Sequence, residues 1–169
     1  FNSAIDFNNQ NARYYAYRGD LRRSTPLRRC TYNCDGGGEG DLKKAIILDP
    51  TLFEAYYFLA LLYHDLGRSL EAISNFDHAL SLDPGNTSVY KDRAKTYVQL
   101  GQNDRAIQDL DRAIAQDPRL AEAHLIRAQV YFNLEQYRPA IDELDQALEL
   151  DRFYSPAYRL RGDSYLALG

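Results

Sequence analysis

The sequence predicts an all-α fold, a solenoid of antiparallel helix pairs, and the main reason is a repeat of fixed length. Tyrosine recurs every 34 residues, at Tyr63, Tyr97, Tyr131 and Tyr165. Alanine and aspartate recur at the same spacing, at Ala79, Ala113 and Ala147 and at Asp49, Asp83, Asp117 and Asp151. A period of this length is typical of proteins in which one supersecondary unit stacks on copies of itself.

The first half of each unit is predicted to be an amphipathic helix, which we call helix A. In residues 53–66 the apolar side chains fall at i, i+3, i+4 and i+7, on one helix face, at Tyr56, Leu59, Ala60 and Tyr63. Gly67 follows directly, as expected of a helix that ends with a residue in the left-handed conformation. A tight turn is therefore expected at Gly67.

The second half of the unit is predicted to be another helix, helix B. It is expected to start near Ser69, which suits an N-cap. Its apolar face consists of Ala72, Ile73, Phe76, Ala79 and Leu80. Asp83-Pro84 is expected to end it, because the residue before proline avoids the helical region and proline has no N–H to donate.

Small residues recur where two helices are expected to approach closely. On helix A they are Ala60, Ala94, Ala128 and Gly162, and on helix B they are Ala72, Ala106 and Ala140. Larger residues lie beside them, and alternating small and large side chains let helix surfaces interdigitate at native density. The two rows are therefore predicted to be buried.

The complete pattern resembles the tetratricopeptide repeat (TPR), whose signature is an aromatic residue, then Leu-Gly, Tyr, Ala, Phe, Ala and Pro. Residues 53–86 carry it as Tyr56, Leu59-Ala60, Tyr63, Ala72, Phe76, Ala79 and Pro84. Residues 87–120 and 121–154 match most of the same offsets, with Arg152 in place of the last proline. The resemblance implies a right-handed superhelix in which helices A line the concave surface.

We expect one array over residues 1–169 rather than two domains. Residues 1–11 resemble the end of a preceding helix B. Residues 12–52 form a repeat with an inserted loop at 25–40, residues 53–86, 87–120 and 121–154 are regular repeats, and 155–169 is helix A of a truncated repeat. Glycine-rich chain is unsuited to a helix interior, so helix B of the first repeat is expected over about residues 41–48, with Leu42 and Ala45 buried.

The two ends of this array are expected to lack polar capping helices. Apolar side chains would then remain exposed, at Phe1 and Ile5 on one end and at Tyr158, Leu160, Tyr165 and Leu168 on the other. Exposed apolar surface marks interaction sites, so we expect self-association through the open repeat ends.

The composition excludes several classes of partner. The formal net charge is −4, too small to imply binding to nucleic acid or to an anionic membrane surface. No apolar run approaches the roughly 20 residues that span a bilayer. The two cysteines form no disulfide framework, which favours a reducing compartment, and we expect a cytoplasmic location.

No motif indicates catalysis, a cofactor or a metal. No histidine has a serine or cysteine partner at a recognisable spacing. Cys30 and Cys34 could form half of a zinc site or a redox pair, but no further ligand lies nearby and two free thiols are favoured. Residues 35–41 lack the Gly-Lys-Ser/Thr of a phosphate loop and the alternating carboxylates of a calcium loop, so a flexible linker is favoured.

Arginine residues form two groups. The cluster of Arg22, Arg23, Arg28 and Arg29 could dock an acidic partner, but a solvated loop is the favoured interpretation. Arginines also recur at one helix A offset, at Arg18, Arg93, Arg127 and Arg161. We interpret these as ion-pairing groups at the repeat seams, with Asp109 and Glu143 on the preceding helices B as partners of two of them.

The candidate binding residues follow from the resemblance, which implies that the second, fifth, ninth, twelfth and thirteenth positions of each repeat face the concave groove. Among these positions the residues expected to bind a partner are Tyr57, Leu61, His64, Lys91, Lys95, Leu125, Gln129, Phe132 and Arg159. Only Lys91 matches the residues with which some TPR domains hold the C-terminal carboxylate of heat-shock chaperones. A complete site of that kind is therefore not expected.

The predicted function is a protein–protein interaction scaffold, not an enzyme, that binds a peptide or helix of a partner in the concave groove. The lysines favour a partner segment with acidic as well as hydrophobic side chains. Two alternatives remain open. The array could be a structural segment of a longer solenoid in a multiprotein assembly, or a regulatory array attached to an enzyme domain outside this sequence.

Overall fold

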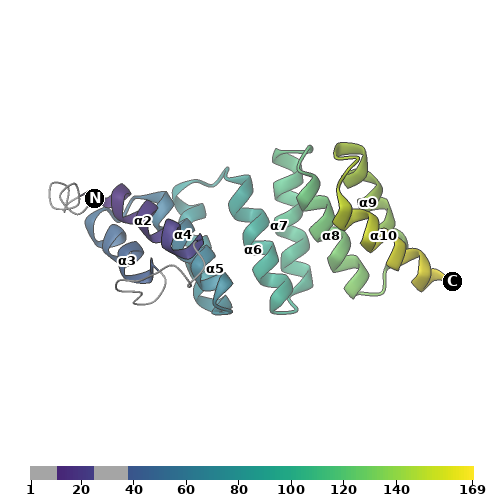
Figure 1. Ribbon diagram of the computed structural model, residues 1–169, viewed down its shortest axis with the longest axis horizontal. Helices are drawn as coiled ribbons and strands as arrows, with labels where there is room; N and C mark the ends of the chain where they lie inside the picture. The colour runs from purple at the N-terminus through teal and green to yellow at the C-terminus, as the bar shows by residue number, and fades with distance from the viewer. Residues whose placement is uncertain (1–10, 25–37) are drawn as a thin grey trace. The chain divides into compact units, whose positions relative to one another are not determined.

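The computed structural model describes residues 11–24 and 38–169, and this part of the chain contains helices and no strand (Figure 1). The all-α prediction is confirmed. Two compact units make up the chain, Phe1–Pro84 and Gly85–Gly169. The first holds α2 (Ala12–Ser24), α3 (Glu39–Leu48), α4 (Phe53–Asp65) and α5 (Ser69–Leu82). The second holds α6 (Thr87–Gln99), α7 (Asn103–Gln116), α8 (Ala121–Asn133), α9 (Tyr137–Leu150) and α10 (Ser155–Leu168).

In the first unit, α2 packs against α3 and α4, and α4 also packs against α3 and α5. The core between α2, α3 and α4 consists of Tyr15, Ala16, Ala45, Leu52 and Ala55. Leu42 and Ala45 are both fully buried, as the sequence predicted. On α5, Phe76 and the alanines on either side of it are fully buried.

In the second unit each helix packs against the next, from α6 to α10, and α8 also contacts α6 and α10 (Figure 1). The helices A of this unit therefore lie next to one another. The core between α8, α9 and α10 consists of Ala128, Ala140, Leu144, Ala147, Leu148, Ala157 and Leu160. Leu160 was expected to be exposed at the open end. It is buried because α10 turns this side chain towards α8 and α9.

Three described turns within helix pairs have the left-handed residue that was predicted at Gly67. Gly67 and Gly101 have φ angles of 71° and 68°, and the equivalent Glu135 has a φ of 59°. The next amide then closes the turn by donating to a carbonyl five positions back, as Arg68 N does to Tyr63 O at 2.8 Å. The backbone thus keeps the turn geometry even where the sequence has no glycine.

Two predicted helix starts are corrected. Helix α3 begins at Glu39, not Asp41, so the end of the expected loop 25–40 belongs to the fold. Gly38 precedes it with φ 96°, and a Cβ on Gly38 would lie 2.3 Å from Gly19 O, so glycine permits this close approach. Ser69 is the first residue of α5 rather than its N-cap, a position that Arg68 occupies.

The small-residue rows are buried as predicted, with one exception. Ala60, Ala94 and Ala128 are fully buried. Gly162 is exposed, and a Cβ there would meet nothing within 4 Å. The predictions for residues 1–10 and 25–37, which include Phe1, Ile5, the Cys30–Cys34 pair, Arg28 and Arg29, lie outside the described residues.

Candidate functional site

A groove of about 540 Å³ crosses the second unit, and three helices A supply its walls. Helix α6 contributes two of the lining residues, and α8 and α10 contribute four each. The lining residues are Lys95, Val98, Leu125, Ile126, Gln129, Phe132, Pro156, Arg159, Leu160 and Asp163. The groove therefore depends on the lateral packing of helices that are 34 residues apart in the sequence.

Five of the nine candidate binding residues meet in this groove. They are Lys95, Leu125, Gln129, Phe132 and Arg159. Sequence reasoning did not include Ile126 and Leu160, which share the sixth position of their repeats. Their 34-residue spacing was visible in the sequence, but the family's inward offsets do not contain that position. Both add apolar surface to the groove.

The groove is apolar along α8. Leu125 and Phe132 are half-buried and pack against the core of α8, α9 and α10. The Phe132 ring lies edge-on to Tyr137, with 5.4 Å between the ring centroids. Gln129 donates from its amide to Asn133 Oδ1 at 2.9 Å. This surface offers apolar contact together with a side-chain amide.

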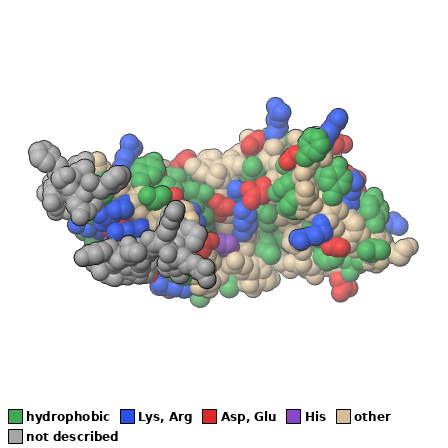
Figure 2. Space-filling model, in the orientation of Figure 1, with side chains coloured by type: hydrophobic (Ala, Val, Ile, Leu, Met, Phe, Trp, Pro, Cys, Tyr) green, Lys and Arg blue, Asp and Glu red, His purple; other side chains and the backbone are tan. Residues whose placement is uncertain are grey.

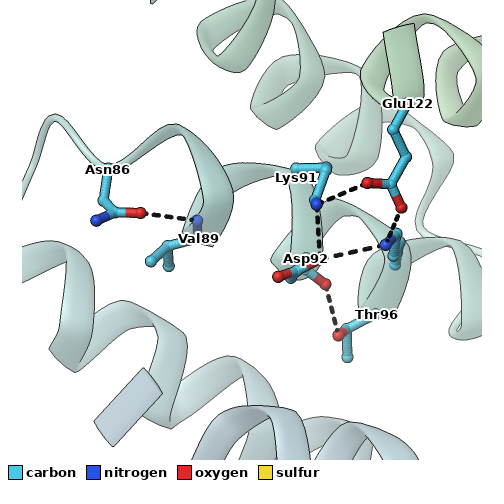
Figure 3. A network of polar contacts seen from close by, with 7 residues as sticks. Asn86, Val89, Lys91, Asp92, Thr96 and Glu122 are labelled. Atoms are coloured by element: carbon cyan, nitrogen blue, oxygen red, sulfur yellow. Dashed lines mark hydrogen bonds and ion pairs between the residues drawn. The ribbon is translucent and has the colours of Figure 1, made fainter. Parts of the chain in front are cut away.

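Lys91 (Figure 3) and Lys95 are engaged within the unit rather than free for a partner. Both ammonium groups donate to Glu122 on α8, at 2.7 Å from Lys91 and 2.6 Å from Lys95. Lys95 also lies 3.3 Å from Asp92 Oδ1, and Lys91 lies 3.7 Å from the same atom. Two ammonium groups thus face two carboxylates, and the network has no net charge.

The pKa values of Lys95 and Glu122 are shifted in the directions expected of groups in a stable ion pair. Burial opposes the charged form of Lys95, but the hydrogen bond to Glu122 and the nearby Asp92 raise its pKa above the usual value. Burial likewise acts to raise the pKa of Glu122, but the hydrogen bonds from Lys91 and Lys95 outweigh it and lower that pKa. Lys95 and Glu122 therefore stay ionised near neutral pH.

Arg159 and Asp163 differ from the lysines. Both line the groove on α10 and both are exposed. Among the residues that the structure describes, neither has a hydrogen-bond or ion-pair partner. A guanidinium and a carboxylate one helical turn apart are therefore available to a bound molecule.

The three candidate residues of the first unit lie on α4. Tyr57, Leu61 and His64 are half-buried and follow the i, i+4, i+7 spacing of one helix face. The Tyr57 ring stacks on Phe53 with 5.8 Å between centroids and lies 6.3 Å from Phe76. Their role in binding stays a prediction, as does that of Lys91.

The seam arginines make ion pairs, but Asp109 and Glu143 pair with other arginines than those expected. Arg93 donates from Nε and Nη2 to Asp109 at 2.7 Å each, and Asp109 lies on the helix B that follows Arg93. Arg127 likewise contacts Glu143 on the following helix at 2.8 Å. Asp109 and Glu143 thus pair with the arginine of the helix A before them and not, as predicted, with the arginine of the helix A after them, because an antiparallel hairpin brings residues 16 positions apart together across its turn.

Preceding helices do supply carboxylates to two of the seam arginines. Arg127 also contacts Asp111 on α7, and Arg161 contacts Asp145 on α9. In the basic cluster, Arg22 pairs with Asp41 and Arg23 pairs with Asp20 and Asp65. These two are parts of the folded first unit, not of a solvated loop.

Two negative observations apply to the described residues only. No group of three or more His, Cys, Asp or Glu side chains is arranged to hold a metal ion in residues 11–24 and 38–169. Over the same ranges, no helix is both long and apolar enough to cross a membrane.

Two family models match the sequence, and both describe the tetratricopeptide repeat. One matches residues 76–130, and the other matches residues 53–86 and 121–154. Among curated proteins, none matches the sequence.

Several solved structures have the same fold. The crystal structure of MamA protein has a TM-score of 0.79 and 23% identity, over 95% of this chain and 84% of that one. YrrB, described as a TPR protein with an unusual peptide-binding site, has a TM-score of 0.74 and 23% identity, over 98% and 82%. The first TPR of Spaghetti (RPAP3), bound to the HSP90 peptide SRMEEVD, has a TM-score of 0.66 and 23% identity, over 69% and 92%. At these identities the likeness shows the fold.

Proposed function

Because this chain belongs to the tetratricopeptide repeat family, we propose that it is a protein-interaction scaffold whose second unit binds a peptide or helix of a partner protein. The observation that carries the proposal is the groove formed by α6, α8 and α10. Its volume of about 540 Å³ is within the range of ligand-binding pockets. The proposal assigns the chain no catalytic activity of its own.

The similar structures support a peptide as the occupant. YrrB is described as having a peptide-binding site, and the RPAP3 domain was solved with a peptide of HSP90. The groove has the composition that such an occupant needs. Leu125, Ile126 and Phe132 offer apolar contact, and buried apolar anchors supply most of the affinity in protein interfaces.

In this proposal, Arg159 recognises the charge of the partner by pairing with one of its carboxylates. Lys91 and Lys95 already donate to Glu122, so an acidic partner would have to displace that carboxylate. Arg159 is exposed and has no partner within the described residues, and its guanidinium matches a carboxylate in a bidentate geometry. We therefore propose a hydrophobic segment with a carboxylate placed near α10.

A chaperone terminus does not fit this charge distribution. Lys91 is the one residue that matches the chaperone-binding pattern, and it is bound to Glu122 at 2.7 Å. We also propose that Tyr57, Leu61 and His64 on α4 extend the partner-binding surface, and that the protein acts in the cytoplasm. Both follow from the sequence pattern and are tested separately from the groove.

The groove is tested by selecting peptides from a random display library on the intact chain, then measuring their affinity by fluorescence anisotropy. Phe132→Ala removes the central ring, and its matched control is Phe153→Ala, because Phe153 is 91% exposed and outside the groove. Arg159→Glu reverses the free cation. Arg138→Glu is its control, since Arg138 is exposed on α9.

Phe132→Ala is expected to weaken binding about tenfold or more, as for a hot-spot residue, and Phe153→Ala is expected to leave the affinity unchanged. Arg159→Glu is expected to weaken acidic peptides and to favour basic ones. Thermal unfolding of each variant separates lost binding from lost folding. Equal affinity of all four variants for the selected peptides would refute the groove as the binding site.

A further inference from the structure

An acidic side chain on α4 lacks the partners that its equivalent in the second unit has. Glu122, the second residue of α8, accepts hydrogen bonds from Lys91 and Lys95 on the preceding helix A, at 2.7 and 2.6 Å. On the face of the second unit that Figure 2 shows, acidic and basic side chains likewise lie next to one another. Glu54 is the second residue of α4, and among the described residues it has no hydrogen-bond or ion-pair partner.

The helix A before α4 explains this difference. At the positions that correspond to Lys91 and Lys95, α2 has Ala16 and Asp20. Ala16 is fully buried, and Asp20 accepts a hydrogen bond from Arg23 at 2.8 Å. Neither side chain can donate a hydrogen bond to a carboxylate. The sequence of α2 therefore leaves Glu54 without the counterions that Glu122 has.

The four arginines of α2 are engaged with other carboxylates. Arg13 lies near Asp49 at the end of α3, because hydrogen bonds from Thr51 and the charge of Arg13 lower the pKa of Asp49. The other three form ion pairs, Arg18 and Arg22 with Asp41, and Arg23 with Asp20 and Asp65. None of these arginines lies within ion-pair distance of Glu54 in the part of the chain that the structure describes.

Aromatic side chains share the face of α4 that carries Glu54. Glu54, Tyr57, Phe58 and Leu61 follow the i, i+3, i+4, i+7 spacing of one helix face, and all four are half-buried. The ring centroids of Tyr57 and Phe58 are 5.9 Å apart, and the Phe58 ring lies 5.7 Å from Tyr17 on α2. The face of an aromatic ring is negative, so the rings attract a cation, as the carboxylate does.

The chain places a cation over an aromatic ring elsewhere in the same unit. The guanidinium of Arg68 lies 4.2 Å from the centroid of the Tyr63 ring. Within residues 11–24 and 38–169, no arginine or lysine lies over the ring of Phe58. The Phe58 ring and the Glu54 carboxylate can therefore both receive a cation from another molecule.

We propose that one surface of the first unit, here called the α4 surface, binds a lysine or arginine side chain of a partner protein. The surface consists of Tyr17 on α2 and of Glu54, Tyr57, Phe58 and Leu61 on α4. The cationic group donates to Glu54, and its apolar stem lies on the rings. An apolar neighbour in the partner contacts Leu61.

This inference rests on the proposed scaffold function, which it extends to the first unit. It differs from the groove in the charge of the partner. The groove in the second unit is proposed to take a hydrophobic segment with a carboxylate, whereas the α4 surface takes a basic one. The two surfaces are therefore tested with different peptides.

Peptide selection on a groove-deficient variant tests the α4 surface alone. The bait is the full chain with Phe132→Ala and Arg159→Glu, and the probe is a displayed library of random peptides. Selected peptides are labelled, and fluorescence anisotropy measures their affinity for the bait with and without Glu54→Lys. Asp142→Lys is the matched control, because Asp142 is exposed on α9 and the change of charge is the same. Glu54→Gln is a milder second variant, and thermal unfolding verifies that each variant folds.

The selected peptides are expected to share a lysine or arginine beside an apolar residue. Both Glu54 variants are expected to weaken their binding about tenfold or more, through loss of one charge-assisted hydrogen bond. Asp142→Lys is expected to leave the affinity unchanged. Replacing the peptide's cationic residue with norleucine keeps an apolar stem and removes the charge, so it should weaken binding as much as Glu54→Gln does.

Four results overturn the proposal: no binding peptide is selected, the selected peptides share no cationic residue, norleucine preserves the affinity, or Glu54→Lys has no greater effect than Asp142→Lys. A failure of the groove proposal is distinguishable from these, because the bait already lacks the ring of Phe132 and the cation of Arg159. That failure appears only in the comparison of the groove variants with the unaltered chain.

Discussion

The ion pair between Arg93 and Asp109 gives the sharpest test of how the repeats are held together. Two parallel hydrogen bonds of 2.7 Å join the guanidinium to the carboxylate. The side chains are 12% and 5% exposed, so both charges are removed from water. Asp109→Asn keeps the size of the side chain but removes the negative charge. The buried guanidinium then loses its counterion.

Removing one partner of a buried pair costs about 3–5 kcal/mol, because the remaining charge stays desolvated without compensation. For a chain of this size, a loss of 1 kcal/mol lowers the melting temperature by about 2–4 °C, so a drop of roughly 10 °C is expected. An exposed pair provides the control. Arg68 and Glu71 are 41% and 48% exposed, and Glu71→Gln should cost under about 1 kcal/mol.

Another repeat of the chain contains a residue combination that should restore the stability lost in Asp109→Asn. Residues 53–86 have Leu59 and Asn75 at the positions of Arg93 and Asp109. Adding Arg93→Leu to Asp109→Asn recreates that combination and removes the buried charge. The double variant is therefore expected to be more stable than Asp109→Asn alone by about 2 kcal/mol or more, since a buried pair can be replaced by apolar groups at little cost.

Urea denaturation followed by circular dichroism measures all four members of this double-mutant cycle. The interaction energy is the difference between the double variant and the sum of the single variants, and contacting residues typically give 0.5–3 kcal/mol. Additive effects of the two substitutions would show that the pair is not a buried, coupled unit. The explanation of the Arg–acid pattern along the chain would then be wrong.

Three further predictions concern the second unit. Ala94→Leu should cost about 1–3 kcal/mol of unfolding free energy by overpacking a fully buried seam, and an unchanged melting temperature would contradict this. Glu135→Gly should stabilise the chain by about 1 kcal/mol in thermal unfolding, because a φ of 59° is strained for glutamate and not for glycine. Burial acts to raise the pKa of Glu143, but hydrogen bonds from His124 and Arg127 outweigh it and lower that pKa below its usual 4.5. The ionised Glu143 therefore stabilises the fold fully above about pH 4.5, and this stabilisation is lost as the pH falls through the lowered pKa. Glu143→Gln should therefore flatten the loss of stability in acid, and an unaltered acid-unfolding curve would exclude this origin.

The repeat period was sufficient to predict the helices and the buried alanine rows. Both properties depend on local spacing, since a helix face is set by i, i+3, i+4 and i+7 and a turn by a residue that tolerates positive φ. Glu135 shows that residue type alone does not predict every left-handed residue. It occupies the offset of Gly67, and the backbone adopts the left-handed conformation there with a φ of 59° although the residue is not glycine.

Contacts between residues far apart in the chain were harder to predict from the sequence. The sequence predicted Gly38 and Asp41 to lie at the end of a flexible linker. The glycine-rich composition of a segment does not show which distant residues pack against it. In the structure Gly38 packs against Gly19, and Asp41 binds Arg18 and Arg22. Any shortening of the insertion must therefore stop before Gly38.

The lysines show why a list of inward positions does not yet describe a binding site. Lys91, Lys95 and Glu122 all occupy positions expected to face the groove, and each could be taken as a contact for a partner. Adjacent helices A bring both ammonium groups to within 2.7 Å of Glu122, so these charges are paired before any partner binds. The charged groove residues that have no partner among the described residues are Arg159 and Asp163, and they lie beside apolar surface. Charge reversal at Lys91 or Lys95 would place carboxylates beside Glu122 and disturb the packing of α6 on α8, whereas changes at Arg159 affect binding alone.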